Sequence, residues 1–286
     1  HKSVDIAKLQ LAAGAVGVCC AKLGEAEALA EGGVQNILIT SPVVTPQAIE
    51  RLIALNGKIG QLRVVADSPD NVDALASATK AAGKALDVLV DIDPGIRRTG
   101  VATPEAAVAL AQRIAAAETL RFAGVQYYCG AQQHIESFAD RRAAIADRTD
   151  YLRRVIEALS RAGYAPEVVT GGGTGTHRID AELGVLTELQ AGSYVFMDKQ
   201  YNDCDLDGGG GKPFETSLVV DAHVISANSA SMATIDAGFK ALSTDGGLPV
   251  VMDGAPAVAM FVFMGDEHGA LIAPDHTFRI GDHVSL

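Results

Sequence analysis

The chain of 286 residues is long enough for one large α/β domain, or for a large domain and a small one. Hydrophobic residues make up 48% and charged residues 20%, which is typical of a globular core and argues against a disordered chain. The net charge of −12 without any Lys/Arg run argues against a nucleic-acid or anionic-membrane partner, and no apolar stretch reaches the roughly 18–20 residues that span a bilayer.

The cysteines indicate a reducing environment. The four of them, at positions 19, 20, 129 and 204, form neither a C-x-x-C pair nor a zinc-binding spacing. The first ten residues, HKSVDIAKLQ, do not resemble a secretory signal. We therefore expect a cytoplasmic protein with reduced thiols.

Over the first 200 residues, short β-branched runs alternate with amphipathic segments rich in Ala, Leu and Glu. The pattern predicts helices over residues 3–15, 22–33, 45–57, 68–83, 103–118 and 137–163, several of which begin at Ser or Thr followed by Pro and end at Gly. It predicts strands over residues 16–20, 36–40, 62–66, 87–93, 122–128, 167–172 and 188–196.

Strand–helix alternation with nearly continuous apolar strands is typical of a parallel sheet that is buried on both faces. Seven strands can be counted, and the chain opens on a helix, so we expect one further strand before it. Eight strands would close a (β/α)8 barrel of the TIM type. An open, doubly wound sheet is the alternative interpretation.

The pattern changes after about residue 200. Residues 201–213, YNDCDLDGGGGKP, are predicted to be a flexible linker, because Pro213 stands where a phosphate loop requires Ser or Thr and no helix follows. Beyond it, β-type runs follow one another without helices. We therefore expect a barrel domain over residues 1–200 and an antiparallel β domain over residues 214–286, with the first barrel strand and the C-terminal end outside this sequence.

A glycine cluster, TGGGTGT at residues 170–176, follows the sixth predicted strand. Glycine is favoured where the backbone turns sharply or approaches another group closely. The seventh strand carries Gly192 and Ser193, and loops after the last strands of a barrel commonly hold a phosphate. Backbone N–H groups and hydroxyls from these two loops, including Thr174 and Gly175, therefore predict a phosphate cradle. Plain tight turns are the alternative.

Polar side chains are expected at the same rim of the barrel. The fifth strand ends in VQYYCGAQQH and the fourth in DIDPGIRRTGV. An arginine, an aromatic ring and amides around a phosphate suit a flat, anionic heteroaromatic ligand. The residues concerned are Asp93, Arg97, Arg98, Gln126, Tyr128, Gln133 and His134.

Several motifs together resemble the D-threonine aldolase and D-serine dehydratase family. They include HKSVDIAKLQLAAGAVGVCC, GIRRTGV, VQYYCGAQQH, TGGGTGT, ELQAGSYVFMD, IDAGFKA and DEHG, in order along the whole chain. Members of this family are pyridoxal 5′-phosphate enzymes of the alanine-racemase fold type. The resemblance implies a (β/α)8 barrel followed by a β domain, in agreement with the pattern of elements.

The resemblance also implies groups that lie outside the sequence. The family's Schiff-base lysine is the first lysine in a pattern like HAKTHKS, which places it two residues before His1. Lys2 matches the second lysine of that pattern, so we do not assign it this role. The family's divalent metal (Mn, Mg or Zn) is held by a His-x-Cys or His-x-Asp motif, expected just after Leu286.

Other cofactor contacts can be carried over by position. The resemblance places Tyr128 beside the pyridoxal ring, Thr174 and the adjacent Gly175 on the phosphate, and Gly192 with Ser193 in the second phosphate loop. It places Arg98 near the cofactor, where Arg98 and His134 are expected to support catalysis. Tyr194 and Gln133 are further candidates for cofactor binding, whereas Ile135 departs from a tyrosine of some relatives.

The implied function is a metal-assisted lyase that acts on D-β-hydroxy-amino acids. D-threonine aldolase, which cleaves its substrate to glycine and an aldehyde, is the first expectation. A D-serine or 3-hydroxyaspartate dehydratase on the same scaffold is the first alternative. A non-catalytic pyridoxal-phosphate homeostasis protein is the second alternative. The family also implies a homodimer.

Overall fold

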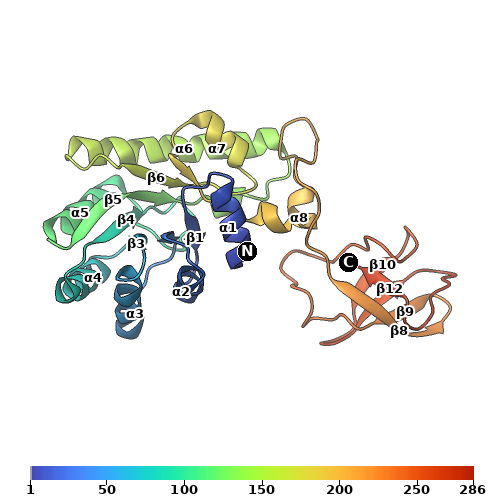
Figure 1. The fold of residues 1–286 in the computed structure, drawn as a ribbon. Coiled ribbons are helices and arrows are strands. Elements are labelled where there is room, and N and C mark those ends of the chain that lie inside the picture. Colours follow the sequence, from blue (N-terminus) through green and yellow to red (C-terminus); the bar gives the residue numbers. More distant parts are fainter. Residues whose placement is uncertain (1) are drawn as a thin grey trace. The chain divides into compact units, whose positions relative to one another are not determined.

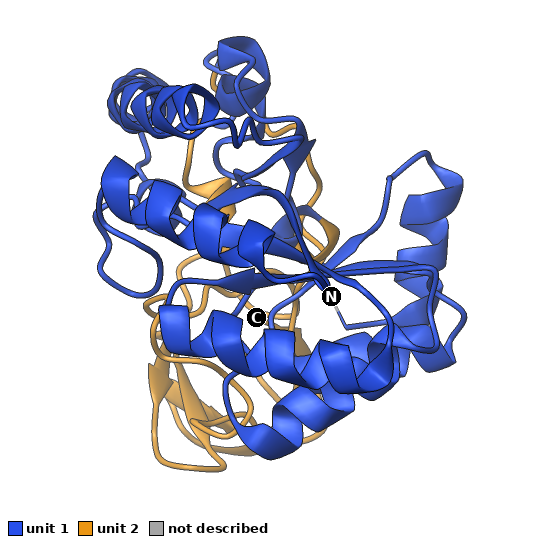
Figure 2. Cartoon of the chain, turned by 90° about the vertical axis from the view of Figure 1, so that its left-hand side faces the viewer, with its two compact units in different colours: residues 1–194, 206–209 blue, residues 195–205, 210–286 orange. Residues whose placement is uncertain are grey.

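The computed structural model describes residues 2–286, so the match of His1 to the family pattern lies outside the described residues. The chain forms two compact units, residues 1–194 with 206–209 and residues 195–205 with 210–286 (Figure 2). Within residues 2–286, no helix combines the length and the apolar character that crossing a bilayer would require.

The first unit alternates strands and helices, as expected. Its strands are β1 (Val18–Cys20), β2 (Asn36–Ile39), β3 (Gln61–Ala66), β4 (Leu86–Asp91), β5 (Leu120–Tyr127), β6 (Val168–Gly171) and β7 (Glu188–Leu189). Its helices are α1 (Val4–Ala12), α2 (Leu23–Glu31), α3 (Pro46–Asn56), α4 (Pro69–Ala82), α5 (Pro104–Ala116), α6 (Phe138–Arg161) and α7 (His177–Leu183), with a 3₁₀ turn η1 (Gly130–Gln132) before α6.

All neighbouring strands of this unit pair in parallel, in the order β1-β2-β3-β4-β5-β6-β7. The parallel sheet predicted from the sequence is therefore confirmed. A doubly wound sheet reverses its strand order at a switch point, and this order contains no reversal, so the alternative interpretation is wrong. Figure 1 shows α2 to α6 following one another around one side of the sheet.

The sheet is curled like a barrel wall. Arg63 on β3 and Glu188 on β7 form an ion pair with 2.8 Å between Nη1 and Oε1. Four strand spacings would separate these strands by about 19 Å in a flat sheet, farther than the two side chains can reach. The sheet must therefore bend until its inner faces meet. Among residues 2–286 seven strands take part, which leaves β1 and β7 as the two edges.

Apolar side chains cover both faces of the curled sheet. The outer face packs against the helices and forms the large core, with residues such as Ile37, Val64 and Val88 fully buried. The inner face carries a smaller cluster formed by Leu38, Val65, Leu89 and Ala123. Burial on both sides explains why the strands read as continuous apolar runs.

Three helices begin as the sequence predicts. The N-cap residues of α3, α4 and α5 are Thr45, Ser68 and Thr103, and each hydroxyl accepts a hydrogen bond from a backbone N–H three residues later. Each is followed by proline at the first helical position, where its missing N–H and fixed φ are tolerated.

The last parallel strand is much shorter than expected. Residues 188–196 were predicted to be one strand, but β7 spans only Glu188–Leu189, and Ser193–Phe196 form a 3₁₀ turn, η2. The hydroxyl of Thr174 accepts a hydrogen bond from the backbone N–H of Tyr194 at 2.9 Å. Because that N–H is committed to a side chain, it is not available for a strand ladder.

The second unit contains the short helix α8 (Lys199–Asn202) and an antiparallel sheet. The sheet has five strands in the order β10-β11-β9-β8-β12, and its core includes Val224, Ile235, Phe261 and Leu271. The predicted antiparallel β fold is thus confirmed. The strands are β8 (Asp221–Ser229), β9 (Met232–Ile235), β10 (Met260–Phe263), β11 (Gly269–Ile272) and β12 (His283–Ser285).

Candidate cofactor site

The glycine cluster lies at the C-terminal end of β6, in a segment that is buried from Gly171 to Thr176. A Cβ atom at Gly171 would lie 1.9 Å from the carbonyl oxygen of Tyr127, and one at Gly175 would lie 2.0 Å from that of Gln133. Gly172 has a φ of +68°, which other residues rarely adopt. These glycines are thus required by close approach to the protein's own backbone and by a left-handed turn.

A buried glutamine holds this loop in place. The side chain of Gln133 is fully buried; its Oε1 accepts a hydrogen bond from Gly175 N at 3.0 Å. Its Nε2 donates to the carbonyl oxygen of Cys129 and to Oγ1 of Thr176. Thr176 in turn donates to the buried carboxylate of Asp180 at 2.6 Å. The sequence suggested Gln133 as a cofactor contact, but these bonds describe an internal support.

The two predicted phosphate loops lie next to each other. The bond between the Thr174 hydroxyl and Tyr194 N joins the glycine loop to residues 192–194. Within residues 2–286, the backbone N–H groups of Thr174, Gly192 and Ser193 have no hydrogen-bond acceptor. A Cβ at Gly192 would meet nothing within 4 Å, so space is open there.

This arrangement fits a phosphate group. Thr174 is only 2% exposed, so its unpaired N–H is a polar group that lacks a partner in the protein interior. Its hydroxyl oxygen accepts from Tyr194, which leaves the O–H free to donate. Clustered backbone N–H groups and hydroxyls suit an anion with several acceptor oxygens.

A cavity of about 530 Å³ lies between the two sheet edges, β1 and β7. A (β/α)8 barrel has a strand in this position, so the cavity is not assigned to a ligand. Its walls come from α1, β1 and the segment after β7, and the side chain of Gln10 donates to the Tyr194 hydroxyl at its margin. The polar and functional residues on the wall are Lys2, Gln10, Cys19, Cys20, Glu25, Gln190, Gly192 and Tyr194.

Lys2 is engaged elsewhere in this wall. Its ammonium group forms an ion pair with Glu25 at 2.8 Å, and this contact raises the pKa of Lys2 above its ordinary value. A raised pKa keeps the amine protonated and therefore non-nucleophilic. Lys2 is therefore not assigned the role of the Schiff-base lysine.

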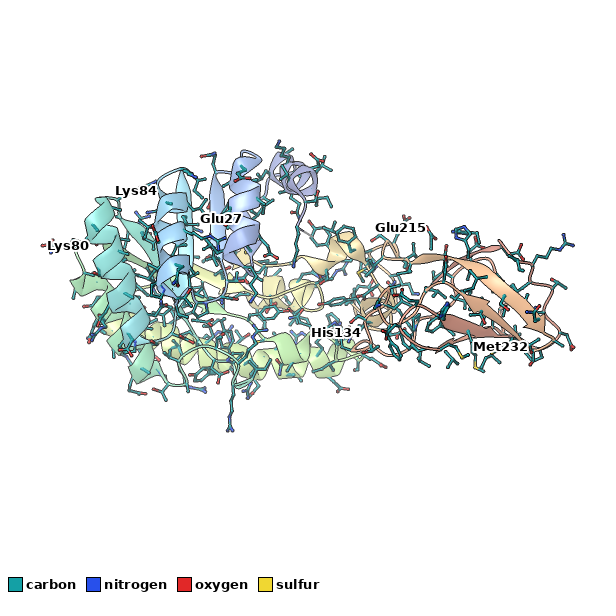
Figure 3. All side chains as sticks on the ribbon, turned by 90° about the horizontal axis from the view of Figure 1, so that it is seen from below. Glu27, Lys80, Lys84, His134, Glu215 and Met232 are labelled. Atoms are coloured by element: carbon teal, nitrogen blue, oxygen red, sulfur yellow. The ribbon has the colours of Figure 1, made fainter. Side chains whose placement is uncertain are left out.

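Tyr128 and Arg98 form a second group of predicted site residues. The guanidinium carbon of Arg98 lies 5.5 Å from the centroid of the Tyr128 ring, within cation–π range. Burial raises the pKa of the Tyr128 phenol, and the charge of Arg98 opposes that rise. Neither residue lines the cavity between the sheet edges. His134 is exposed and lies between η1 and α6 (Figure 3).

A polar network in the barrel interior was largely missed by the sequence analysis. Gln126 Nε2 donates to the carbonyl oxygen of Thr40 at 3.0 Å and to Asp91 Oδ1 at 2.9 Å. Gln190 Nε2 donates to Gln126 Oε1 at 3.3 Å and to Thr170 Oγ1 at 3.1 Å. The sequence did contain a signal for this network, namely a carboxylate and amides within otherwise apolar segments. Buried polar groups need hydrogen-bond partners, so such side chains are expected to bond to one another.

Asp91 is the buried acid of this network. It is 3% exposed, and burial raises its pKa, while hydrogen bonds from Thr99 and Gln126 oppose the rise. Among residues 2–286, no group of three or more His, Cys, Asp and Glu side chains is arranged to hold a metal ion. The described residues therefore fit a phosphate-bearing cofactor but do not fit a metal.

Comparison with known proteins identifies the families that this chain matches. Residues 1–200 match the model of the alanine racemase N-terminal domain, and residues 217–286 match that of a putative serine dehydratase domain. A 3-hydroxy-D-aspartate aldolase from Paracoccus denitrificans (strain Pd 1222) is 40% identical over 293 residues, which cover 100% of this chain and 74% of the relative.

Two further relatives bear on the reaction. The crystal structure of D-threonine aldolase from Filomicrobium marinum superposes with a TM-score of 0.94 at 39% identity, covering 100% of this chain and 76% of that one. A D-threo-3-hydroxyaspartate dehydratase from Delftia sp. (strain HT23) is 30% identical, covering 86% of this chain and 64% of the relative.

Proposed function

Because the chain belongs to the family of the alanine racemase N-terminal domain, we propose that it is a pyridoxal 5′-phosphate-dependent lyase that acts on D-β-hydroxy-amino acids. The reaction proposed is aldol cleavage of the Cα–Cβ bond, with D-threonine as the first substrate to test. The observation that carries the proposal is the bond between the Thr174 hydroxyl and Tyr194 N, which joins two donor-rich loops.

The residues of the described chain bind and orient the cofactor. Bound pyridoxal phosphate supplies an electron sink for negative charge that develops at the substrate's α-carbon. We assign the phosphate to the N–H groups of Thr174, Gly192 and Ser193 and to the Thr174 hydroxyl. Gly175 and Gln133 position the glycine loop, since their polar groups bond to each other.

Tyr128 and Arg98 are proposed to act on the ring side of the site. Their stacking fixes the two side chains relative to each other. A guanidinium group remains charged at every relevant pH and favours negative charge on a neighbouring ligand atom. His134 is proposed as a supporting residue because it lies in the segment that also carries Tyr128.

Aldol cleavage is favoured over dehydration by sequence similarity. The aldolase relative is 40% identical and the dehydratase relative 30% identical. A non-catalytic homeostasis protein is the weakest alternative, because residues 217–286 form a second unit that matches a serine dehydratase domain. Such a unit is not needed to store a cofactor.

We further propose that activity depends on a divalent metal, as the family resemblance implies. Residues 2–286 contain no suitable ligand cluster, so no step of the reaction is assigned to the metal here. Loss of activity with a chelator and its return with Mn, Mg or Zn would support the proposal. Full activity in excess chelator would refute it.

The product distinguishes the two reactions. Incubation with D-threonine is expected to give glycine and acetaldehyde, whereas a dehydratase would give 2-oxobutanoate. D-3-hydroxyaspartate should be assayed in parallel, because the 40% identical relative is named for that substrate. Absence of both product sets, together with no uptake of pyridoxal phosphate, would reject the proposed function.

Thr174→Ala tests the cofactor cradle separately. Removing a hydroxyl that donates to a charged phosphate should weaken pyridoxal-phosphate affinity about tenfold, with a smaller effect on turnover at saturation. Thr277→Ala, at an exposed position of the second unit, is the matched control. Unchanged affinity of the Thr174 variant would mean that the glycine loop has another role.

The assembly and location are proposed from the resemblance and the thiols. We propose a homodimer, to be checked by analytical ultracentrifugation of the protein. All four cysteines are free in the structure, which supports a cytoplasmic location. A monomer at every concentration, or a secreted protein, would contradict these two proposals.

A further inference from the structure

The hydroxyl of Thr176 is the centre of a hydrogen-bond relay behind the glycine loop. The backbone N–H of Gly173 and the side-chain nitrogen of Gln133 both donate to its Oγ1, at 3.2 and 3.1 Å. The atom of Gln133 must be its nitrogen, because it also contacts the carbonyl oxygen of Cys129, which can only accept. These two donors use both lone pairs of the Thr176 hydroxyl.

The proton of this hydroxyl is therefore directed to Asp180. The carboxylate oxygen Oδ2 of Asp180 lies 2.6 Å from Thr176 Oγ1, and both side chains are buried. Because the hydroxyl has no lone pair left, Asp180 must be the acceptor of this bond. Burial raises the pKa of Asp180, and the hydrogen bond from Thr176 opposes that rise. Gly172 leaves room for the carboxylate, since a Cβ there would lie 2.6 Å from Oδ2.

The relay holds the loop on both sides of Thr174. On one side, Thr176 accepts from the N–H of Gly173 through Oγ1 and donates its own N–H to the Gly173 carbonyl oxygen at 3.2 Å. On the other side, Gln133 Oε1 accepts from the N–H of Gly175 at 3.0 Å. The C=O and N–H of a trans peptide point in opposite directions, so the unpaired N–H of Thr174 points away from Thr176.

We propose that Asp180 is a positioning residue for the proposed phosphate cradle, and that it acts through Thr176 and Gln133. Without an acceptor at Asp180, the buried Thr176 hydroxyl would have to turn to find another partner for its proton, and one of its two donors would lose its bond. The N–H of Thr174 would then lose its fixed direction. This inference rests on the proposed function, because it assumes a phosphate bound to that N–H.

The test compares two ligands that differ only in the phosphate, pyridoxamine 5′-phosphate and pyridoxamine, by isothermal titration calorimetry. Neither ligand forms a Schiff base, and the ratio of their Kd values isolates the contribution of the phosphate cradle. In Asp180→Ala and in Thr176→Val this ratio should fall about tenfold, while the Kd of pyridoxamine stays within about twofold. A role in stability alone would lower the Tm and leave the ratio unchanged.

Two conservative variants should keep the preference for the phosphate. Thr176→Ser retains the hydroxyl, and Asp180→Asn retains an oxygen that can accept from it. Asp147→Ala, at an exposed position of α6, is the matched control for the loss of a carboxylate and should also keep the preference. Loss of the preference in Thr176→Ser and Asp180→Asn alike would contradict the relay.

Amide hydrogen exchange tests the relay in the unmodified protein, without any substitution. In protein isotope-labelled at glycine and threonine, the amides of Gly173 and Gly175 should exchange at least about tenfold more slowly than an unprotected peptide. Exchange of these two amides at the unprotected rate would overturn the inference even if the Ala and Val variants failed to fold.

The binding outcomes separate the inference from the function on which it rests. If the unmodified protein prefers pyridoxamine 5′-phosphate and the ratio survives in Asp180→Ala and Thr176→Val, the inference is overturned and the proposed function stands. The same conclusion follows if these variants lose affinity for both ligands in parallel. If the unmodified protein binds the two ligands equally, or binds neither, both the inference and the proposed function are rejected.

Discussion

Gly175 offers the sharpest test of why the glycine loop has its sequence. In Gly175→Ala the new Cβ would lie 2.0 Å from the carbonyl oxygen of Gln133, about 1.4 Å inside the 3.4 Å at which ordinary contact begins. The obstacle is backbone, so it cannot rotate away. The loop must shift, which also breaks the buried bond from Gly175 N to Gln133 Oε1.

The cost can be estimated from these two effects. Overpacking a well-packed interior costs about 1–3 kcal/mol, and leaving a buried polar group unpaired costs about as much again. A loss of about 3 kcal/mol in the free energy of unfolding is therefore expected. For a unit of this size, that corresponds to a fall in Tm of about 6–12 °C.

The assay is thermal unfolding followed by circular dichroism, with Gly192→Ala as the matched control. A Cβ at Gly192 meets nothing within 4 Å, so its Tm should stay within about 2 °C of the unmodified protein. Cofactor affinity should instead fall in this variant. Equal Tm values for the two variants would refute the reasoning.

Three other predictions concern groups in the interior of the first unit. Burial raises the pKa of Asp91, so the stability that this carboxyl contributes is lost as pH rises through that raised pKa. In urea titrations Asp91→Asn should therefore gain stability relative to the unmodified protein as pH rises above the ordinary aspartate pKa, and a constant difference would contradict this. Burial raises the pKa of Cys20 and of Cys129 to about 12, so at pH 8 only about one thiol in 10⁴ is ionised; both should react far more slowly with a disulfide reagent in the native than in the unfolded protein, and similar rates would show that these thiols are accessible. Glu188→Gln removes the negative charge that pairs with the guanidinium of Arg63 and should lower the free energy of unfolding by about 2 kcal/mol. A loss below about 0.5 kcal/mol would show that the ion pair contributes no more than one exposed to solvent.

Local features of the fold could be predicted from the sequence because they depend on neighbouring residues. The caps at Thr45, Ser68 and Thr103 could be predicted because each hydroxyl and the backbone N–H that donates to it lie three positions apart. The parallel sheet could also be predicted, because the alternation of strands and helices is visible in neighbouring segments of the sequence. The length of β7 was wrong because its end is decided by Thr174, which lies far away in sequence.

The candidate site could likewise be predicted only in part. The glycine loop and the residues after β7 could be associated by strand counting, and the bond between Thr174 and Tyr194 brings them together. The glycines themselves were attributed to an anion, whereas Gly171 and Gly175 are required by contacts with Tyr127 and Gln133. The spacing of residues along the sequence does not reveal which backbone segments approach each other in the fold.

The interior network was inaccessible for a related reason. Asp91 lies on β4, Gln126 on β5 and Gln190 directly after β7, and their hydrogen bonds depend on how strongly the sheet curls. Periodicity predicts which face a residue occupies but not which residue it meets across a barrel. Polar residues within apolar strands are therefore the signal to follow before coordinates exist.

The curled sheet also has a consequence for how the chain folds. Every parallel strand pairs with its neighbours in sequence, so assembly can proceed stepwise along the chain without closing long loops. The ion pair between Arg63 and Glu188 instead joins residues 125 positions apart. Contacts of such separation carry the largest loop-closure entropy and are expected to form after the rate-limiting step. Weakening such contacts should then accelerate unfolding while leaving the refolding rate almost unchanged. The unfolding rate of the first unit would thus be limited mainly by contacts between residues that are far apart in sequence.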